Sequence, residues 1–413
     1  MTTRVQTLIV GAGQAGLAAS RWLTDLGQEH LVLERGSVAE RWRSERWDSF
    51  RLLTPNWQTR LPGHAYDGPD PDGFMPGSEI ISFFDDYARS FGPDVRTGVT
   101  VTSVAPVEDG WRVHAGDEVY VADNVVVATG HYDRPAVPAI ANGDLGEVQQ
   151  LHSATYRNPD QLAPGAVLVV GSGPSGQQIA DELALAGREV HLAVGRHRPL
   201  PRTYRGADVY AWLDRMGMLK RTIDTLPPGS DPATAPSVVL SGDKHDLNLH
   251  RLAANGVSMV GRLTGISGGR LRFAADLAQR VAEADAHTAR LRQVIDGYVE
   301  DRGLRVPAEE PASFGSPAWA GSARRALDVR DVSTIVWATG YWRDYSWLHA
   351  PVLTERGEPD HHRGVTAAAG LYFVGLRWQY RRNSNFIDGV GADAGYVAMQ
   401  IARRNRRWCE GAA

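Results

Sequence analysis

The stretch Val5-Gln-Thr-Leu-Ile-Val-Gly-Ala-Gly-Gln-Ala-Gly16 joins an apolar run to a glycine signature, and a helix-like segment follows. Ala166-Val-Leu-Val-Val-Gly-Ser-Gly-Pro-Ser-Gly176 has the same plan. Glycines at this spacing allow a tight turn from strand to helix, and the helix N-terminus can bind a pyrophosphate. Two such motifs predict two dinucleotide sites. The candidate cofactor-binding residues are Gly11, Gly13, Gln14, Ala15 and Gly16 in the first turn and Gly171, Ser172, Gly173, Ser175 and Gly176 in the second.

The residue types that follow the second strand of each unit distinguish the two sites. Glu34 ends the strand at 30–34, near the roughly 20-residue offset at which an acid binds the ribose hydroxyls of an adenine dinucleotide. In the second unit the strand at 189–194 leads instead into Gly195-Arg-His-Arg198. Because basic residues there can accept a 2′-phosphate, we expect FAD at the first site and NADPH at the second. Arg196 is the main candidate, with Arg198 and Arg202 as alternatives.

Composition and charge exclude several classes of function. The 413 residues are 43% hydrophobic and 22% charged, with a net charge of -4, which predicts a globular protein of more than one domain and no nucleic-acid partner. No apolar segment approaches the roughly 18 residues typical of a membrane span, so we expect a cytoplasmic protein without a membrane partner. Cys409 is the only cysteine, which excludes an in-chain disulfide, a cysteine metal site and a redox-active cysteine pair. We expect no metal.

A second repeat accompanies the glycine motifs. Val125-Val-Val-Ala-Thr-Gly130 and Ile335-Val-Trp-Ala-Thr-Gly340 each read as a buried strand that ends in Ala-Thr-Gly. Small residues let the chain leave the strand beside a dinucleotide, although the tripeptide alone is also typical of a simple strand-ending turn. The additional candidate cofactor-binding residues are Ala128, Thr129, Gly130, Ala338, Thr339 and Gly340.

With these motifs the chain resembles the flavin-containing monooxygenase superfamily, in a bacterial branch similar to the plant indole-3-pyruvate monooxygenases. The resemblance covers nearly the whole chain. It also rests on Glu34-Arg35, Glu40-Arg-Trp-Arg43, Trp47-Asp-Ser-Phe-Arg-Leu-Leu-Thr-Pro55, His152-Ser-Ala-Thr-Tyr156 and Ala338-Thr-Gly-Tyr341.

This resemblance implies an α/β fold with two Rossmann-like dinucleotide-binding domains. The FAD domain would comprise residues 1–160 and 330–413, and the NADPH domain, with a loop and a helical insertion, residues 161–329. The polar crossing from Pro159 to Gly165 agrees with this division. The resemblance places Arg35, Arg41, Trp42, Val101, Gly375 and the helix near Asp393 at the FAD. One of Trp42, Trp47 and Trp57 is expected to contact the flavin.

The chain departs from the family pattern at two places. Asp144-Leu-Gly146 precedes His152 by six residues rather than four, so only the His-Ser-x-x-Tyr half of the fingerprint matches. His152 is then either a channel residue or a linker histidine that caps a turn. The position of the family's active-site asparagine falls on Leu53, while Asn56 lies three residues away. Asn56 is the catalytic candidate, with an ordinary turn as the alternative.

The resemblance implies a monooxygenase that uses NADPH and O2 to oxygenate a small organic substrate through a C4a-(hydro)peroxyflavin. An FAD-dependent NADPH dehydrogenase or reductase without oxygen insertion is the first alternative, and a non-catalytic redox-sensing flavoprotein is the second. The sequence leaves a homodimer open. Residues 277–298 carry apolar positions at helical spacing, and we expect this helix to pack on a domain face rather than roof the substrate cavity.

Overall fold

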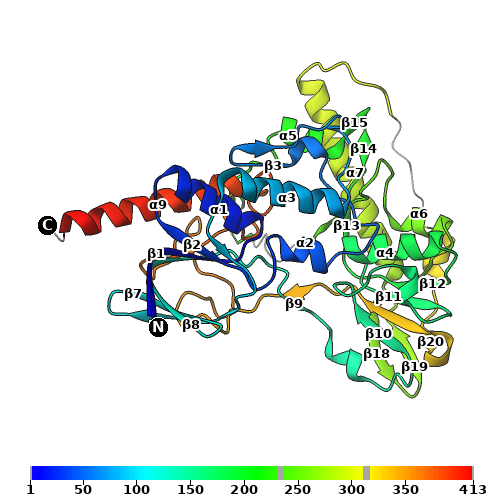
Figure 1. Ribbon diagram of the computed structural model, residues 1–413. Coiled ribbons are helices and arrows are strands. Elements are labelled where there is room, and N and C mark those ends of the chain that lie inside the picture. The colour runs from blue at the N-terminus through cyan, green and yellow to red at the C-terminus, as the bar shows by residue number, and fades with distance from the viewer. Residues whose placement is uncertain (1, 228, 231–235, 310–316, 412–413) are drawn as a thin grey trace.

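The computed structural model describes residues 2–227, 229–230, 236–309 and 317–411. Two sheets with parallel strands form its two sides, and the chain crosses between them twice (Figure 1). The mixed α/β architecture with two Rossmann-like units, which the family resemblance implies, is confirmed.

The first sheet has the strand order β5-β2-β1-β8-β7-β6, and β23 also pairs with β8. Its strands are β1 (Thr2–Val10), β2 (His30–Leu33), β5 (Val95–Arg96), β6 (Val101–Val107), β7 (Gly110–Ala115), β8 (Glu118–Val127) and β23 (Leu371–Phe373). Strands β5, β2, β1, β8 and β23 pair in parallel, whereas β6 and β7 form an antiparallel extension. The carboxyl ends of β1, β2 and β8 therefore meet at one edge, where ligands bind in open α/β sheets.

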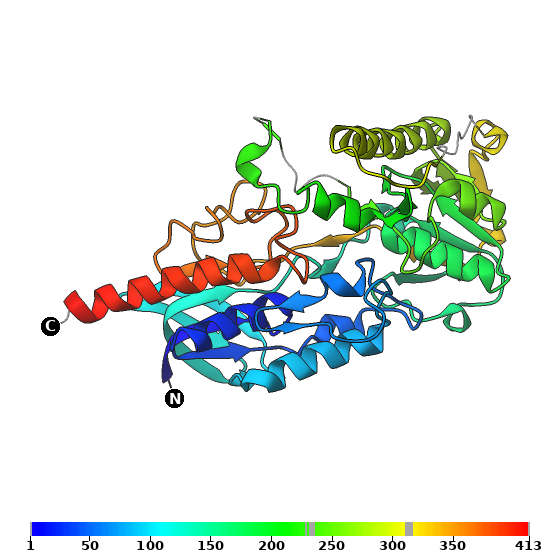
Figure 2. The ribbon, with the colours of Figure 1, turned by 90° about the horizontal axis from the view of Figure 1, so that it is seen from above.

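Helices α1 (Gln14–Asp25), α3 (Gly77–Phe91) and α9 (Val390–Gly411) belong to the first unit. Successive strand side chains point to opposite faces, so Ile9 packs on the helical side while Leu8 and Val10 pack on the other. Helix α9 lies along α1 (Figure 2), and Trp22 Nε1 donates to the carbonyl oxygen of Gly391 at 2.8 Å. This contact fixes the start of α9 beside the first glycine turn.

The second sheet has the order β10-β21-β11-β12-β17, with every pair parallel. Its strands are β10 (Gln149–His152), β11 (Val167–Val170), β12 (Val190–Ala193), β17 (Ser258–Val260) and β21 (Thr334–Trp337). Helix α4 (Pro174–Leu185) packs on one face, and the other is covered by a small sheet of β18 (Leu263–Ser267), β19 (Arg270–Phe273) and β20 (Ala326–Asp328). Since the second sheet begins at 149 and ends at 337, it extends beyond the 161–329 range expected for the inserted domain.

A third group of elements packs beside the second sheet. It contains β13 (Arg198–Pro199), β14 (Thr203–Tyr204), β15 (Ala207–Asp208), α5 (Val209–Arg215), β16 (Val238–Val239), α6 (Leu249–Ala254), α7 (Leu277–Asp301) and α8 (Ala318–Gly321). The expected amphipathic helix is confirmed as α7, which buries Leu277, Val281, Ala284, Leu291 and Ile295. It packs against its neighbours, as expected, and contributes no residue to the main cavity. Part of the loop at 226–236 lies outside the described residues.

The two crossings between the sheets pair with each other. Strand β9 (Arg134–Pro135) leaves the first sheet, β22 (Tyr341–Trp342) returns from the second, and the two are antiparallel partners. Helix α2 (Glu40–Ser44) and the hairpin of β3 (Arg60–Leu61) and β4 (His64–Ala65) complete the first unit. Among the described helices, none is long and apolar enough to cross a membrane.

Candidate active site

One large cavity lies between the carboxyl ends of the two sheets. Its volume is about 1550 Å³, and residues from both glycine turns line it. This exceeds the roughly 300–1,000 Å³ of a typical small-molecule site, so there is room for two dinucleotides. The predicted site residues that line it are Gly11, Gly13, Gln14, Ala15, Glu34, Arg35, Arg41, Trp42, Trp47, Val101, Ala128, Thr129, Gly130, Gly171, Ser172, Gly173, Ser175, Arg196, Ala338, Thr339, Gly340 and Gly375.

Each glycine turn is packed against the Ala-Thr-Gly segment of its own unit. Gly11 has φ +104°, and a Cβ there would lie 2.8 Å from the carbonyl oxygen of Ala128. A Cβ on Gly16 would lie 1.8 Å from the carbonyl oxygen of Gly11. The second turn repeats this packing, because a Cβ on Gly171 would lie 2.4 Å from the carbonyl oxygen of Ala338. The two repeats seen in the sequence are therefore packing partners, and Gly16 and Gly176 act below the cavity rather than in its wall.

Gly13 and Gly173 are different, because they face open space. A Cβ on either would meet no atom within 4 Å. They are the N-cap residues of α1 and α4, and neither helix has a side-chain cap. The unpaired N–H groups of both helix N-termini thus open onto the cavity, as binding of a pyrophosphate requires. On this observation the residues present fit two dinucleotides.

Glu34 stands directly after β2, where the sequence places it, and is buried. Its Oε2 accepts a hydrogen bond from Ala12 N at 2.7 Å, and its Oε1 accepts one from Gly36 N at 2.9 Å. These bonds hold the carboxylate in a fixed orientation at the cavity wall. Since a carboxylate has about four acceptor positions, it retains capacity for ribose hydroxyls.

The wall beside the first turn combines paired charges with aromatic rings. Arg35 and Arg41 both contact Asp133 Oδ1, at 3.1 and 2.5 Å. The ring centroids of Trp47 and Phe50 are 5.2 Å apart in an edge contact, and those of Trp42 and Phe50 are 6.0 Å apart. Trp42 and Trp47 therefore reach the cavity, whereas Trp57 packs against the third group of elements.

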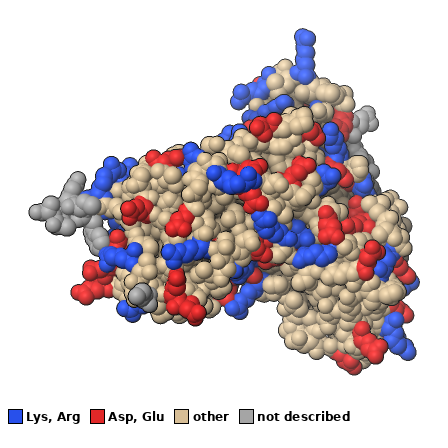
Figure 3. Space-filling model, in the orientation of Figure 1, with Lys and Arg blue, Asp and Glu red and all other residues tan. Residues whose placement is uncertain are grey.

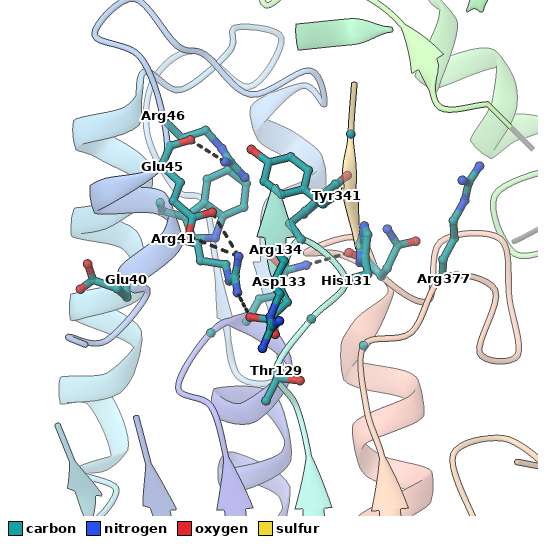
Figure 4. A pocket seen from close by; sticks show the side chains of 18 of the residues that line it. Glu40, Arg41, Glu45, Arg46, Thr129, His131, Asp133, Arg134, Tyr341 and Arg377 are labelled. Atoms are coloured by element: carbon teal, nitrogen blue, oxygen red, sulfur yellow. Dashed lines mark hydrogen bonds and ion pairs between the residues drawn. The ribbon is translucent and has the colours of Figure 1, made fainter. Parts of the chain in front are cut away.

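Several residues that sequence reasoning missed also line the cavity: Arg46, His131, Tyr341, Arg377, Asn385 and Ile387. All four of Arg46, His131, Tyr341 and Arg377 line the cavity from different segments, and Figure 4 shows Tyr341 and His131 between Arg46 on one side and Arg377 on the other. Burial, followed by the charges of Arg343, Arg377, Arg41 and Arg46, lowers the pKa of His131 to about 3. His131 and Tyr341 directly follow the two Ala-Thr-Gly segments, a position that could have drawn attention to them.

The three basic candidates for a 2′-phosphate lie in different surroundings. Arg196 is exposed and lines the cavity just after β12. Arg198 is exposed in β13 and lies outside the cavity lining. Arg202 is fully buried and bonded to Asp208 and to two backbone carbonyls, so the proposal that it replaces Arg196 is wrong.

Asn56, His152 and Asp393 also lie outside the cavity lining. Asn56 is buried at the start of a 3-10 helix, and its Nδ2 donates to the carbonyl oxygen of Asp70 at 2.9 Å, as an ordinary turn residue would. His152 Nδ1 accepts from Ala154 N, and its Nε2 lies 2.9 Å from the Gly340 oxygen, which fits a linker histidine. Asp393 is buried in the first turn of α9, while Asn385 and Ile387 just before that helix reach the cavity.

Comparisons with known proteins agree with this geometry. Residues 8–214 match the family model "Pyridine nucleotide-disulphide oxidoreductase". An uncharacterized oxidoreductase CzcO-like from Geobacillus kaustophilus is 33% identical over 96% of this chain and 98% of its own. Indole-3-pyruvate monooxygenase YUCCA1 from Oryza sativa is 26% identical over 85% of this chain and 87% of its own. A flavin-containing monooxygenase from Stenotrophomonas maltophilia has the same fold, with a TM-score of 0.66 at 20% identity over 97% of this chain and 99% of its own.

Fold, site and relatives together define an enzyme that uses a flavin and a nicotinamide cofactor, a flavin-dependent oxidoreductase. The chain belongs to the pyridine nucleotide-disulphide oxidoreductase family and, as its motifs indicate, to the flavin monooxygenase superfamily.

Proposed function

We propose that this chain is a monooxygenase that binds FAD and NADPH and uses O2 to oxygenate a small organic substrate. The observation that carries the proposal is the shared cavity, since both uncapped helix N-termini open onto one space. A nicotinamide bound at one turn can thus reach a flavin bound at the other. The name of the plant relative, an indole-3-pyruvate monooxygenase, supports oxygenation as the outcome.

The assignment of the two cofactors rests on charge. Glu34 is fixed by two backbone N–H groups at the first turn, where its carboxylate suits ribose hydroxyls and repels a 2′-phosphate. Arg196 is the third residue after β12 in the second unit, whereas Glu34 directly follows β2, and Arg196 is exposed to the cavity. Its guanidinium suits a 2′-phosphate. These two residues favour FAD at the first turn and NADPH at the second.

The bound flavin would supply the redox and oxygen chemistry. The protein's own residues bind, orient and exclude water. The N–H groups before α1 and α4 hold the pyrophosphates, and Glu34 and Arg196 hold the ribose ends. Trp42, Trp47 and Phe50 form an apolar wall that keeps water from the reacting atoms. No nucleophilic side chain is required.

Rapid mixing of the NADPH-reduced, FAD-loaded enzyme with oxygen tests oxygenation against simple reduction. A monooxygenase shows a transient absorbance that differs from both oxidised and reduced flavin and decays without stoichiometric hydrogen peroxide when substrate is present. Direct reoxidation with one peroxide per NADPH, with every substrate tried, would defeat the proposal and favour a reductase. Complete failure of the FAD-loaded protein to oxidise NADPH would instead favour a redox sensor.

A further inference from the structure

The carboxylates that line the cavity are already engaged. Glu34 accepts from Ala12 N and Gly36 N, and Glu40 accepts from Ser37 N. Glu45 and Asp133 pair with Arg41, and Asp344 pairs with Arg134. These carboxylates therefore bond to backbone N–H groups or pair with arginines other than Arg46.

Arg46 lies half-buried at the cavity wall, just after α2. Its guanidinium stacks over Trp42 at 5.1 Å and over Phe50 at 5.4 Å from the ring centroids, and its Nη1 donates to the carbonyl oxygen of Glu45. Within the described ranges it forms no ion pair. Stacking on the two rings therefore holds the Arg46 guanidinium in place at an apolar wall. A guanidinium carries five N–H groups, so Arg46 retains donors for another partner.

His131 reaches the same space from the crossing after β8. Its ring packs on Tyr132 with centroids 4.0 Å apart. Neither of its ring nitrogens bonds to any residue that the structure describes. The largest electrostatic influences on the ring come from four arginines, Arg343, Arg377, Arg41 and Arg46, and a field of that sign attracts an anion. Figure 3 shows that Lys and Arg side chains also gather between the two halves of this face, over the region of α2.

We propose that Arg46 and His131 form the recognition site for a carboxylate group of the substrate, which makes this enzyme selective for small organic acids. The inference rests on the proposed function, because it names the class of substrate at the same site. The guanidinium would bind the carboxylate oxygens, His131 would donate a further hydrogen bond, and the Trp42–Phe50 wall would contact the apolar part of the acid.

A phosphate of either dinucleotide has the same anionic chemistry and is the other source to be separated. The two helix N-termini and Arg196 already offer donors to the phosphates. Arg46 instead lies among aromatic rings, where a carboxylate attached to an apolar body fits better. Binding measurements with the two dinucleotides can therefore assign the anion.

Benzoate is a suitable probe, with benzamide as its uncharged isostere, in titrations of the FAD-loaded enzyme followed by flavin difference spectra and by calorimetry. We expect benzoate to bind at least tenfold more tightly than benzamide. Arg46→Met keeps an unbranched side chain against the rings but removes the charge, and it should weaken benzoate about tenfold or more. Arg46→Lys should recover part of the loss, and His131→Phe, which keeps the ring contact, should weaken benzoate several-fold.

Arg43→Met is the matched control, because Arg43 lies on α2, pairs with Asp85 and is absent from the cavity lining. It should leave benzoate binding unchanged. Equal affinity of the wild type and Arg46→Met for benzoate would overturn the proposal, as would equal binding of benzoate and benzamide. Loss of FAD or a weakened NADPH Kd in Arg46→Met, with benzoate unaffected, would assign the guanidinium to a dinucleotide phosphate.

These titrations need no turnover. If benzoate binds as expected but rapid mixing shows only peroxide release, the carboxylate site stands and the monooxygenase proposal fails. If oxygenation is observed while Arg46→Met binds benzoate normally, the monooxygenase proposal stands and the carboxylate site fails.

Discussion

Arg202 Nη1 donates to the carbonyl oxygen of Leu53 at 2.8 Å, which joins the third group of elements to the segment that lines the cavity beside the first turn. The guanidinium also binds the Ser241 oxygen and Asp208, and it stacks over Phe74 at 4.7 Å. It is fully buried. One side chain thus fixes the position of Leu53 relative to the second half of the molecule.

Arg202→Met should destabilise the protein by about 3 kcal/mol, because Asp208 and two buried carbonyls lose their donor. Thermal unfolding followed by release of flavin fluorescence measures the loss. Arg198→Met is the control, since Arg198 is exposed in the neighbouring strand and should change stability little. Equal unfolding temperatures for Arg202→Met and the wild type would show that the contact contributes no net stability.

Gly13→Ala should separate folding from cofactor binding. The added Cβ meets no protein atom, so the apoprotein should stay about as stable as the wild type, whereas the methyl group occupies the approach of the FAD pyrophosphate. We expect FAD affinity to fall at least tenfold, measured by fluorescence titration of the apoprotein. Gly173→Ala is the corresponding change in the second turn, and it should weaken NADPH binding while the FAD content stays normal. A loss of FAD in Gly173→Ala would contradict the assignment of the turns.

Arg196→Ala should raise the NADPH KM by tenfold or more and leave the NADH KM unchanged, because only NADPH carries the 2′-phosphate. Steady-state oxidation of both cofactors provides the measurement. Arg198→Ala, two residues along and outside the cavity lining, should affect neither. Equal effects of Arg196→Ala on NADPH and NADH would refute the specificity role.

Asp388 predicts a pH dependence of stability. Burial raises its pKa to about 6, with Arg60 3.9 Å away and a hydrogen bond from Asn383 opposing the shift. In the unfolded chain an aspartate titrates near 3.9. The folded state therefore keeps a proton that the unfolded state has lost, so this contribution to stability is complete below about pH 4 and disappears as pH rises through 6.

Asp388→Asn should accordingly be more stable than the wild type at pH 8, and the advantage should vanish at pH 4. Denaturant unfolding at the two pH values tests this. Asp117→Asn, at an exposed turn, is the control and should show no such difference. An advantage of the same size at both pH values would mean that Asp388 does not titrate on unfolding.

Local pattern was enough to predict the strands beside the two pairs of repeated motifs, the glycine turns and α7, because each depends on residues near in the chain. Gly11 and Gly16 meet within one turn, and the apolar spacing of α7 follows directly from its burial. Which side chains meet around the cavity could not be predicted in this way. Arg46 and His131 are 85 positions apart, and only the crossing of the chain after β8 brings them to one cavity.

The limits of the second sheet escaped prediction for a related reason. β21 is the buried strand expected at 335–337, but β10 is the polar segment Gln149-Gln-Leu-His152, and nothing within it shows that it pairs with β21. Residue type alone also left two roles open for Asn56: its amide bonds within a local turn and it lies outside the cavity lining, so a catalytic role for it stays a prediction. Whether the two sheets are independently folding domains stays a prediction.

The pairing of β9 with β22 has a consequence for the connectivity of the molecule. Arg134 faces Trp342 across one ladder, so the points where residues 136–340 depart and return are neighbouring strands, about 5 Å apart. The intervening segment is therefore covalently connected to the rest of the protein at one place, the paired strands β9 and β22, although it also packs on the first unit through contacts such as Arg202 with Leu53. A turn of a few residues would suffice to close the remainder into a continuous chain, and the same turn could join the ends of the excised segment into a ring.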